Sequence, residues 1–284
     1  MNIISELSLT MAWISVSSSG IDSMLKPKTW GTYWDIFGEK LVGYMDIPKG
    51  ARILDVGSGG GSVLYPLTKR VGPQGYVTGI ELCNHCADKT ASEIKRCHIK
   101  NAESIYLDAR QTGFPDSYFD CITAGFIGWN DYFDFEKNKY TKPDLLMKEI
   151  TRLLKPGGIF GISTWLLQED LDWMYMLLTS QSIESKRNYH IENEQGWRNI
   201  LTEWEYTNIQ IFIESVTYAY ESKDFWWKEM TDYDWIEEDS NQEIIESMKN
   251  LAFEKIKSKI KNGRIPFTRR ALFVIGKKGG GKTQ

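Results

Sequence analysis

Short apolar runs alternate with stretches of helical hydrophobic spacing along the first 165 residues of the chain. The runs have the length and apolar content of buried strands, and the stretches between them place apolar side chains three or four positions apart, as amphipathic helices do. Strands are predicted at 52–56, 76–82, 104–109, 119–126 and 159–163, and helices near 30–45, 63–71, 84–98 and 143–154. This alternation favours a parallel sheet with right-handed crossovers.

The pattern is less regular after Trp165. Four further elements are predicted: a helix at 197–204, a strand at 209–216, a helix at 240–260 and a strand at 271–275. Ser240 and Glu243 have the spacing of a capping box at the start of the second helix. The stretches 166–194 and 221–265 look inserted. We therefore expect one doubly wound, Rossmann-like α/β domain with an N-terminal helical extension.

The first predicted strand runs into a glycine-rich turn, Asp55-Val56-Gly57-Ser58-Gly59-Gly60-Gly61, which a helical pattern follows. Glycines allow a sharp turn and a close approach of backbone to a ligand, and the helix start offers free N–H groups. The turn therefore predicts a nucleotide-like ligand. A dinucleotide fingerprint would need a third glycine at position 62, where the chain has Ser62.

Charge and composition limit the classes of partner. The chain has 34 basic and 38 acidic side chains, a net charge of −4, and this balance gives no general attraction to nucleic acid or anionic membrane. No apolar run approaches the ~20 residues of a membrane span, and the apolar patch at 11–16 lacks a basic region before it. We expect a cytoplasmic protein with no membrane partner.

Four cysteines stand at positions 83, 86, 97 and 121. Cys83 and Cys86 with Cys97 have a superficial likeness to a zinc site. The segment between Cys86 and Cys97 reads as one helix, which separates these two thiols by about 16 Å at 1.5 Å per residue. We therefore predict no metal site and interpret the cysteines as reduced and intracellular.

The order of five segments resembles the class I S-adenosylmethionine-dependent methyltransferases, in particular the small-molecule branch of ubiquinone- and menaquinone-type enzymes. The segments are Asp55–Gly61, the acid Glu81, Asp108-Ala109, Phe114–Asp120 and Leu153–Gly158. The resemblance implies a mostly parallel seven-stranded sheet with an antiparallel last strand and insertions after strands five and six. It divides the chain into an N-terminal helical extension or lid (1–48), a cofactor-binding core (51–165), insertions (166–194 and 221–265), the last strand (266–276) and a flexible tail (277–284).

The same resemblance implies S-adenosylmethionine as the cofactor. It places Glu81 on the ribose hydroxyls, Asp108 on the adenine amino group and the glycine turn against the methionyl part. Tyr33, at a helix start, is expected to bring its hydroxyl to the cofactor. The predicted cofactor-binding residues are Tyr33, Gly57, Ser58, Gly59, Gly61, Glu81, Leu82, Asp108, Ala109 and Phe126.

The resemblance implies a small-molecule acceptor, but the sequence identifies neither this molecule nor the atom that receives the methyl group. His190, Asp131 and Tyr132 are candidate general bases, and none is assigned a catalytic role. Three aromatic groups are expected either to close over the acceptor or simply to pack the core. They are Trp30, Tyr33, Trp34 and Phe37; the stretch 129–135; and Trp173, Tyr175, Trp226 and Trp227.

Several alternatives remain beside a small-molecule methyltransferase. The basic run 249–270 raises RNA as a substrate, although its lysines share a helix with an apolar stripe, so nucleic acid is not the expected partner. A non-catalytic cofactor-binding protein and an NAD-dependent oxidoreductase are further alternatives. Gly276–Thr283 also fits the phosphate-loop pattern, but we expect no phosphate site because no helix is predicted after it.

Overall fold

A seven-stranded sheet in the order β3-β2-β1-β4-β7-β9-β8 forms the centre of the computed structural model, which describes residues 27, 32–179, 192–231 and 242–280. The strands are β1 Arg52–Val56, β2 Tyr76–Glu81, β3 Ala102–Tyr106, β4 Phe119–Gly125, β7 Leu154–Gln168, β8 Tyr206–Tyr220 and β9 Ile265–Lys278. The first five of these are parallel, and β9 runs antiparallel between β7 and β8. The predicted seven-stranded, mostly parallel sheet with an antiparallel last strand is confirmed.

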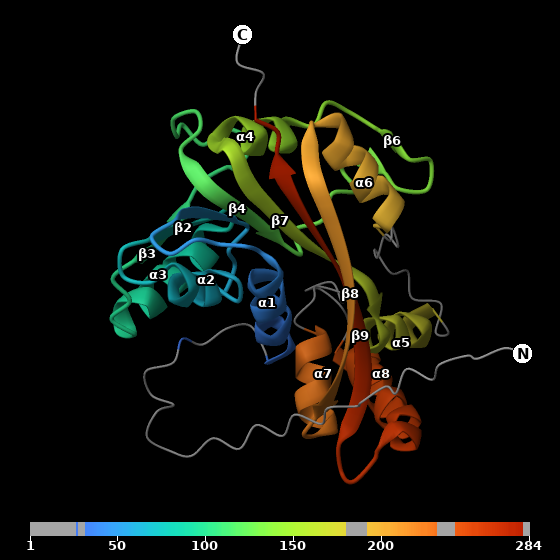
Figure 1. Ribbon diagram of the computed structural model, residues 1–284. Helices are drawn as coiled ribbons and strands as arrows, with labels where there is room; N and C mark the ends of the chain where they lie inside the picture. Colours follow the sequence, from blue (N-terminus) through green and yellow to red (C-terminus); the bar gives the residue numbers. More distant parts are fainter. Residues whose placement is uncertain (1–26, 28–31, 180–191, 232–241, 281–284) are drawn as a thin grey trace, which may run out of the picture.

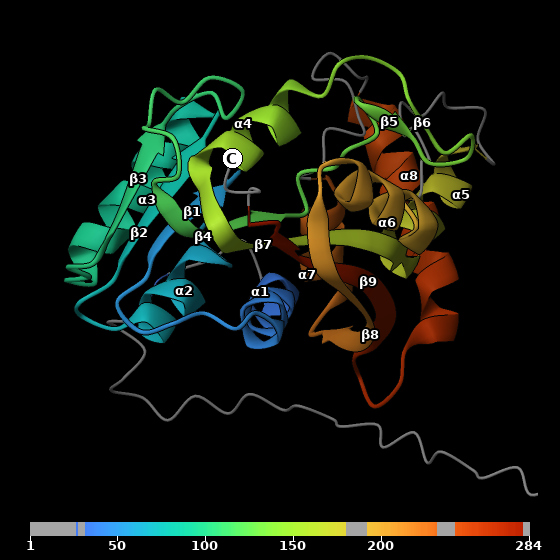
Figure 2. The same ribbon diagram turned by 45° about the horizontal axis from the view of Figure 1, so that its top comes forward.

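Helices cover both faces of the sheet (Figure 1). They are α1 Thr32–Tyr44, α2 Leu64–Val71, α3 Asn84–Arg96, α4 Leu145–Leu153, α5 Glu169–Thr179, α6 Glu194–Glu203, α7 Lys223–Thr231 and α8 Gln242–Ile256. Apolar residues of α1, α2 and α3 share one core cluster, and those of α4 and α6 share another. Figure 2 shows α1 and α2 on the opposite side of the sheet from α4. This is the doubly wound arrangement.

Three strands are longer than the sequence predicts. β7 begins at Leu154 instead of residue 159, because Leu154 pairs with Phe119 across a register shift in the neighbouring strand β4. β8 and β9 continue past the sheet as an antiparallel ribbon that ends with Tyr220 paired to Ile265. Both predicted insertions therefore begin or end inside strands, and residues 277–278, predicted as tail, belong to β9.

Helices α5, α7 and α8 gather around the ribbon of β8 and β9 (Figure 1). Their apolar side chains form a third core cluster with Phe267 of β9. Trp226 and Trp227 are buried in it, and the ring of Trp173 meets that of Trp226 edge-on at 5.3 Å. Core packing, one of the two interpretations of this aromatic group, is confirmed for these tryptophans.

Some predictions fall on residues outside the described ranges: Trp30, His190, the capping residue Ser240 and the end of the chain after 280. The first part of the phosphate-loop pattern, Gly276 and the two lysines after it, lies within β9, and its last part lies outside the described residues. Among the described helices, none combines the length and the apolar character that crossing a bilayer requires.

Candidate functional site

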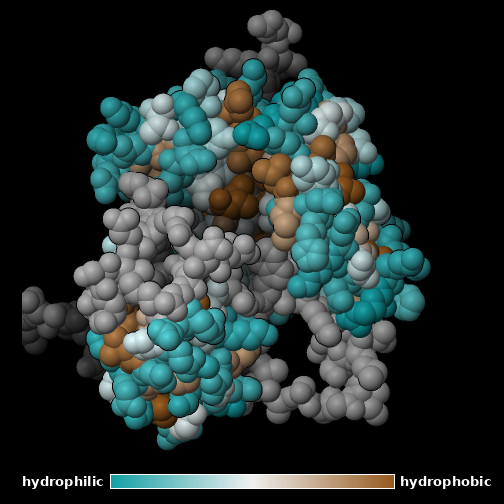
Figure 3. All heavy atoms as spheres, turned by 180° about the vertical axis from the view of Figure 1, so that it is seen from behind, coloured by the Kyte–Doolittle hydropathy of each residue, from teal (hydrophilic) through white to brown (hydrophobic). Residues whose placement is uncertain are grey.

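A cavity of about 520 Å³ lies at the carboxyl ends of β1, β2 and β4. In an open α/β sheet this is where ligands bind, at the point where the strand order reverses. The rear face of the molecule is hollowed near its centre, with hydrophobic side chains at the bottom of the hollow (Figure 3). The cavity is lined by Trp34, Val56, Gly57–Gly60, Ser62, Ile80–Leu82, Leu107–Arg110, Gly125–Gly128, Asp131, Tyr132 and Leu146.

The glycine turn after β1 presents bare backbone to this cavity. Gly57 has φ 68°, and a Cβ added to it would lie 2.2 Å from Cγ2 of Ile127. The N–H groups of Gly57 and Ser58 both donate to the carbonyl of Ile80, at 2.9 and 3.1 Å, which fixes the turn against the end of β2. A side chain at Gly57 would therefore displace a neighbour that itself lines the cavity.

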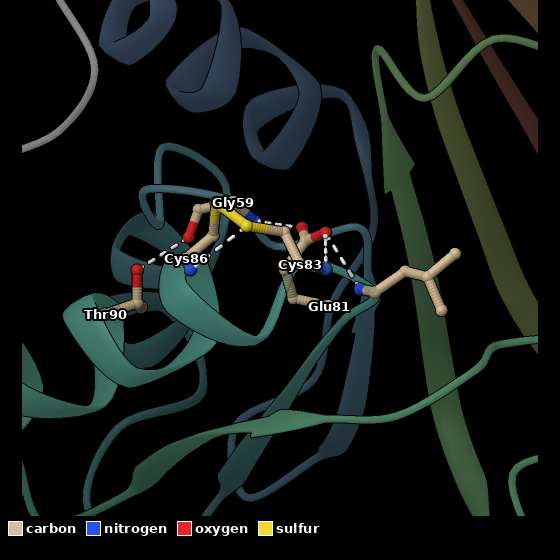
Figure 4. Close-up of a disulfide and its surroundings, with 6 residues drawn as sticks. Gly59, Glu81, Cys83, Cys86 and Thr90 are labelled. Atoms are coloured by element: carbon tan, nitrogen blue, oxygen red, sulfur yellow. Dashed lines mark hydrogen bonds between the residues drawn. A yellow bond between two sulfur atoms is a disulfide. The ribbon is translucent and has the colours of Figure 1, made fainter.

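The carboxylate of Glu81 stands at the end of β2 and is held by three backbone N–H groups (Figure 4). Gly59 donates to Oε2 at 2.9 Å, and Leu82 and Cys83 donate to Oε1 at 2.8 and 3.1 Å. These bonds fix the orientation of the carboxylate relative to the glycine turn. An oriented carboxylate is a strong acceptor for a pair of neighbouring hydroxyls.

Asp108 lies after β3 and is paired with Arg110. The guanidinium of Arg110 donates to both carboxylate oxygens, at 2.6 to 3.1 Å, and its backbone N–H donates to Oδ1 at 2.9 Å. The side-chain hydrogen bond from Arg110 is the main cause that holds the pKa of Asp108 below its usual range. An amino group that binds Asp108 must therefore share the carboxylate with Arg110, a residue that the sequence analysis did not consider.

Asp55 is buried at the end of β1, beneath the glycine turn. Thr123 donates to its Oδ1 at 2.7 Å, whereas its Oδ2 has no hydrogen-bond partner among the described residues. Burial raises the pKa of Asp55 to about 7, and the charge of Glu81 contributes in the same direction. The hydroxyl of Ser58 is also buried without a partner in the described part of the chain.

Replacing Asp55 with asparagine is expected to raise stability at pH 8 and to lower it at pH 4. The folded pKa, about 7, exceeds the ordinary value of 3.8, so the native state binds more protons between these values and unfolding free energy falls as pH rises. Asparagine removes the buried charge but leaves an amide N–H unpaired at both pH values. The expected change is therefore a gain of about 1–2 kcal/mol at pH 8 and a loss of about 1–3 kcal/mol at pH 4. Thermal unfolding of both proteins at the two pH values measures it. An equal difference at both values would contradict the assignment.

Aromatic side chains form part of the cavity wall. Phe126 follows β4 with φ 58°, an uncommon backbone conformation for a bulky residue. Its ring stacks on Trp165, with centroids 4.1 Å apart, and meets the ring of Trp34 edge-on at 5.3 Å. Phe126 and Trp34 line the cavity, so β4 and α1 together close its apolar side.

Tyr33 is not where the sequence analysis expected it. It is absent from the cavity lining, 2% exposed, and its ring lies under the guanidinium of Arg269 at 3.8 Å. Consecutive residues of a helix point about 100° apart. Because Tyr33 points toward Arg269, the next residue of α1, Trp34, points toward the cavity. The expected contact of the Tyr33 hydroxyl with a cofactor is therefore corrected, and Trp34 takes its place in the wall.

The other predicted cofactor residues line the cavity, with one exception. Gly61, at φ 85°, packs against Tyr65, whose Cε2 would lie 2.4 Å from an added Cβ. Its role in the structure is close packing under the turn. Asp131 and Tyr132, two of the candidate bases, also line the cavity.

Cys83 and Cys86 are joined by a disulfide at the start of α3, with Cα atoms 5.2 Å apart (Figure 4). The interpretation of these two cysteines as reduced is wrong for this structure. Residues three apart at a helix start lie within disulfide distance of each other, so the long distance from Cys86 to Cys97 does not prevent this bond. In the described ranges, no cluster of His, Cys, Asp or Glu could hold a metal ion.

Comparison with known proteins gives a family and a fold. A sequence profile described as "Methyltransferase domain" matches residues 47–231. Demethylmenaquinone methyltransferase of Listeria welshimeri is 31% identical over 114 residues, which make up 40% of this chain and 44% of that protein. The chain therefore matches less than half the length of this relative.

Two solved structures show the same fold at low identity. The YcgJ protein of Bacillus subtilis superposes with a TM-score of 0.55 and 16% identity over 87% of this chain and 100% of that one. Phosphoethanolamine N-methyltransferase 2 of Haemonchus contortus, solved with S-adenosylhomocysteine, superposes with a TM-score of 0.50 and 16% identity over 86% of this chain and 52% of that one.

Proposed function

Because the chain belongs to the methyltransferase domain family, we propose that it is an enzyme that transfers a methyl group from S-adenosylmethionine to a small-molecule acceptor. The observation that carries the proposal is the position of Glu81, whose oriented carboxylate faces the glycine turn at the cavity. The family assignment removes the NAD-dependent alternative. Residues of the glycine turn, Glu81 and the pair Asp108-Ala109 also line the same cavity, as binding of one cofactor requires.

The residues present fit this cofactor. Glu81 would hold the ribose hydroxyls, and Asp108 with the backbone of Ala109 would hold the adenine. Gly57, Ser58 and Gly59 would lie along the methionyl part, where the space next to Gly57 is already filled by Ile127 and leaves no room for a side chain. Ser58 lines the cavity, and its hydroxyl, which has no partner among the described residues, provides a polar atom for the ligand.

The chain contributes positioning and the exclusion of water. S-adenosylmethionine supplies a methyl group already activated by its sulfonium, so the protein's part is to align the acceptor and to desolvate it. Trp34, Phe126, Ile127 and Leu146 give the cavity an apolar wall suited to this. Tyr132 is poorly suited as a general base, because burial raises the pKa of its hydroxyl and keeps it protonated.

We also propose that different segments of this one domain have different roles. Residues 51–165 hold the cofactor and α1 closes one side of the cavity, while helices α5, α7 and α8 of the segments 166–194 and 221–265 pack around the ribbon of β8 and β9. The named relative acts on demethylmenaquinone, and a small, largely apolar acceptor is consistent with the aromatic wall. A cytoplasmic location stays a prediction from the sequence, and so does the expectation that nucleic acid is not a partner.

The proposal predicts that S-adenosylhomocysteine binds to the purified full-length chain more tightly than NAD does. Isothermal titration with each ligand measures this directly, because S-adenosylhomocysteine needs no acceptor to bind. Incubation of a metabolite pool with methyl-labelled S-adenosylmethionine then separates an enzyme from a non-catalytic binding protein. Tighter binding of NAD would contradict the proposal.

A further inference from the structure

The Cys83–Cys86 disulfide lies immediately beside the carboxylate that anchors the proposed ribose site. Cys83 follows Glu81 by two residues, and its backbone N–H donates to Oε1 of Glu81 at 3.1 Å. Leu82, between them, lines the cavity. A change at this disulfide therefore acts on the segment that positions Glu81.

The disulfide is one link in a closed ring of contacts (Figure 4). Gly59 donates to Oε2 of Glu81, Oε1 of Glu81 accepts from Cys83, and Cys83 is bonded to Cys86. One turn further along α3, the hydroxyl of Thr90 donates to the carbonyl of Gly59 at 2.6 Å and completes the ring. The ring holds the glycine turn, the acid and the start of α3 in one arrangement.

The chemistry of the pair suits reversible reduction. Cys83 is exposed and Cys86 is partly exposed, so a reductant can reach the bond. Both stand at the N-terminal end of a 13-residue helix, where the helix dipole and the Cys-x-x-Cys spacing favour the thiolate form. Disulfides in a reducing compartment are typically redox-sensing or transient.

We propose that Cys83 and Cys86 are a reversible dithiol–disulfide site, and that the oxidised state is the one that binds the cofactor tightly. A thiolate of a dithiol reductant attacks Sγ of Cys83, the S–S bond breaks, and Cys86 leaves as a thiolate that takes up a proton. The second thiol of the reductant attacks the mixed disulfide and releases Cys83 as a thiol. Two electrons pass to the protein, and the reductant becomes a disulfide.

Reduction removes the side-chain cross-link between Cys83 and the first turn of α3. The segment after Glu81 is then held to this turn only by the backbone and its hydrogen bonds, such as that from the N–H of Ala87 to the carbonyl of Cys83. The segment must then become ordered when the cofactor binds. The free energy spent on this ordering is lost from binding, so the affinity for the cofactor falls. This inference rests on the proposed function, because it concerns the affinity of the same cofactor site.

The test compares S-adenosylhomocysteine binding to the oxidised full-length protein and to the same protein reduced with dithiothreitol. We expect binding about threefold to tenfold weaker after reduction. Alkylation by iodoacetamide followed by peptide mass spectrometry reports the state of each thiol, and Cys83 and Cys86 should be labelled only after reduction. Isothermal titration measures affinity in both states.

Two variants provide matched controls. The double variant Cys83→Ser/Cys86→Ser should bind like the reduced protein and should not respond to dithiothreitol. Cys97→Ser, at a cysteine outside the disulfide, should keep the full response. Equal affinity in the two states, or labelling of Cys83 and Cys86 before reduction, would overturn this inference and leave the proposed function intact. Absence of binding in the oxidised protein would instead overturn the proposed function, and this inference with it.

Discussion

Glu81→Gln is expected to weaken S-adenosylhomocysteine binding about tenfold to hundredfold. Loss of a charged hydrogen-bond acceptor costs about 1.5–3 kcal/mol, and each 1.4 kcal/mol is tenfold in affinity. The glutamine amide would also turn an N–H2 group toward backbone donors, either that of Gly59 or those of Leu82 and Cys83. Isothermal titration of the variant and the parent protein measures the change.

Glu93→Gln is the matched control for this experiment. Glu93 lies on α3 and pairs with Arg96 on the same helix, and it is not part of the cavity lining. Its replacement removes the same charge from the protein and should leave affinity within a factor of about two, since exposed pairs of this kind contribute little. Equal effects of the two substitutions would show that net charge, and not the position of Glu81, controls binding.

The core of the site was predictable because its chemistry is local in sequence. The first strand and its glycine turn are marked by one short stretch of sequence, and the acid at the end of the next strand follows about twenty residues later. Parallel strands bring their carboxyl ends to one edge of the sheet. Gly57, Glu81 and Asp108 were therefore placed correctly at the cavity from residue order and strand pattern.

The errors arise where distant residues decide the arrangement. Tyr33 and Trp34 are adjacent and aromatic, and the residues that bury Tyr33, such as Arg269 on β9, lie far from it in the sequence. Arg110 is not part of the five segments that resemble the family. It matters to the site because it pairs with the carboxylate of Asp108. Contacts between residues far apart in the sequence produce no periodic pattern from which they could be predicted.

Strand length was underestimated for a related reason. The residues of β8 and β9 beyond the sheet alternate between the third core cluster and solvent, and their neighbours are helices α5, α7 and α8 instead of further strands. A sequence shows the alternation but not the partner, so the predicted strand 209–216 stops short of residues 217–220, and residue 265 was placed in an insertion. The helices that cover this ribbon explain why it needs no further strand.

Arg269→Met is expected to destabilise the protein by about 3–5 kcal/mol, because it leaves a buried carboxylate without its cation. The Arg269 and Asp170 side chains are 2% and 1% exposed and lie 2.6 Å apart. Methionine fills much of the arginine volume, but among the described residues Asp170 keeps the donors of Tyr220 and of the Leu171 backbone and no cation. Denaturant titration followed by tryptophan fluorescence measures the unfolding free energy.

Arg198→Met is the control for the loss of an arginine, since its pair with Glu194 on α6 is exposed and should contribute about 0–1 kcal/mol. The double variant Arg269→Met/Asp170→Leu tests the cause, because replacing both members of a buried pair by apolar residues restores most of the stability. If the double variant were as unstable as Arg269→Met, the loss would instead come from the ring contacts of Arg269 with Tyr33 and Trp165. In either case Arg269 ties α5 to α1, so its loss should loosen the helix that carries Trp34 into the cavity.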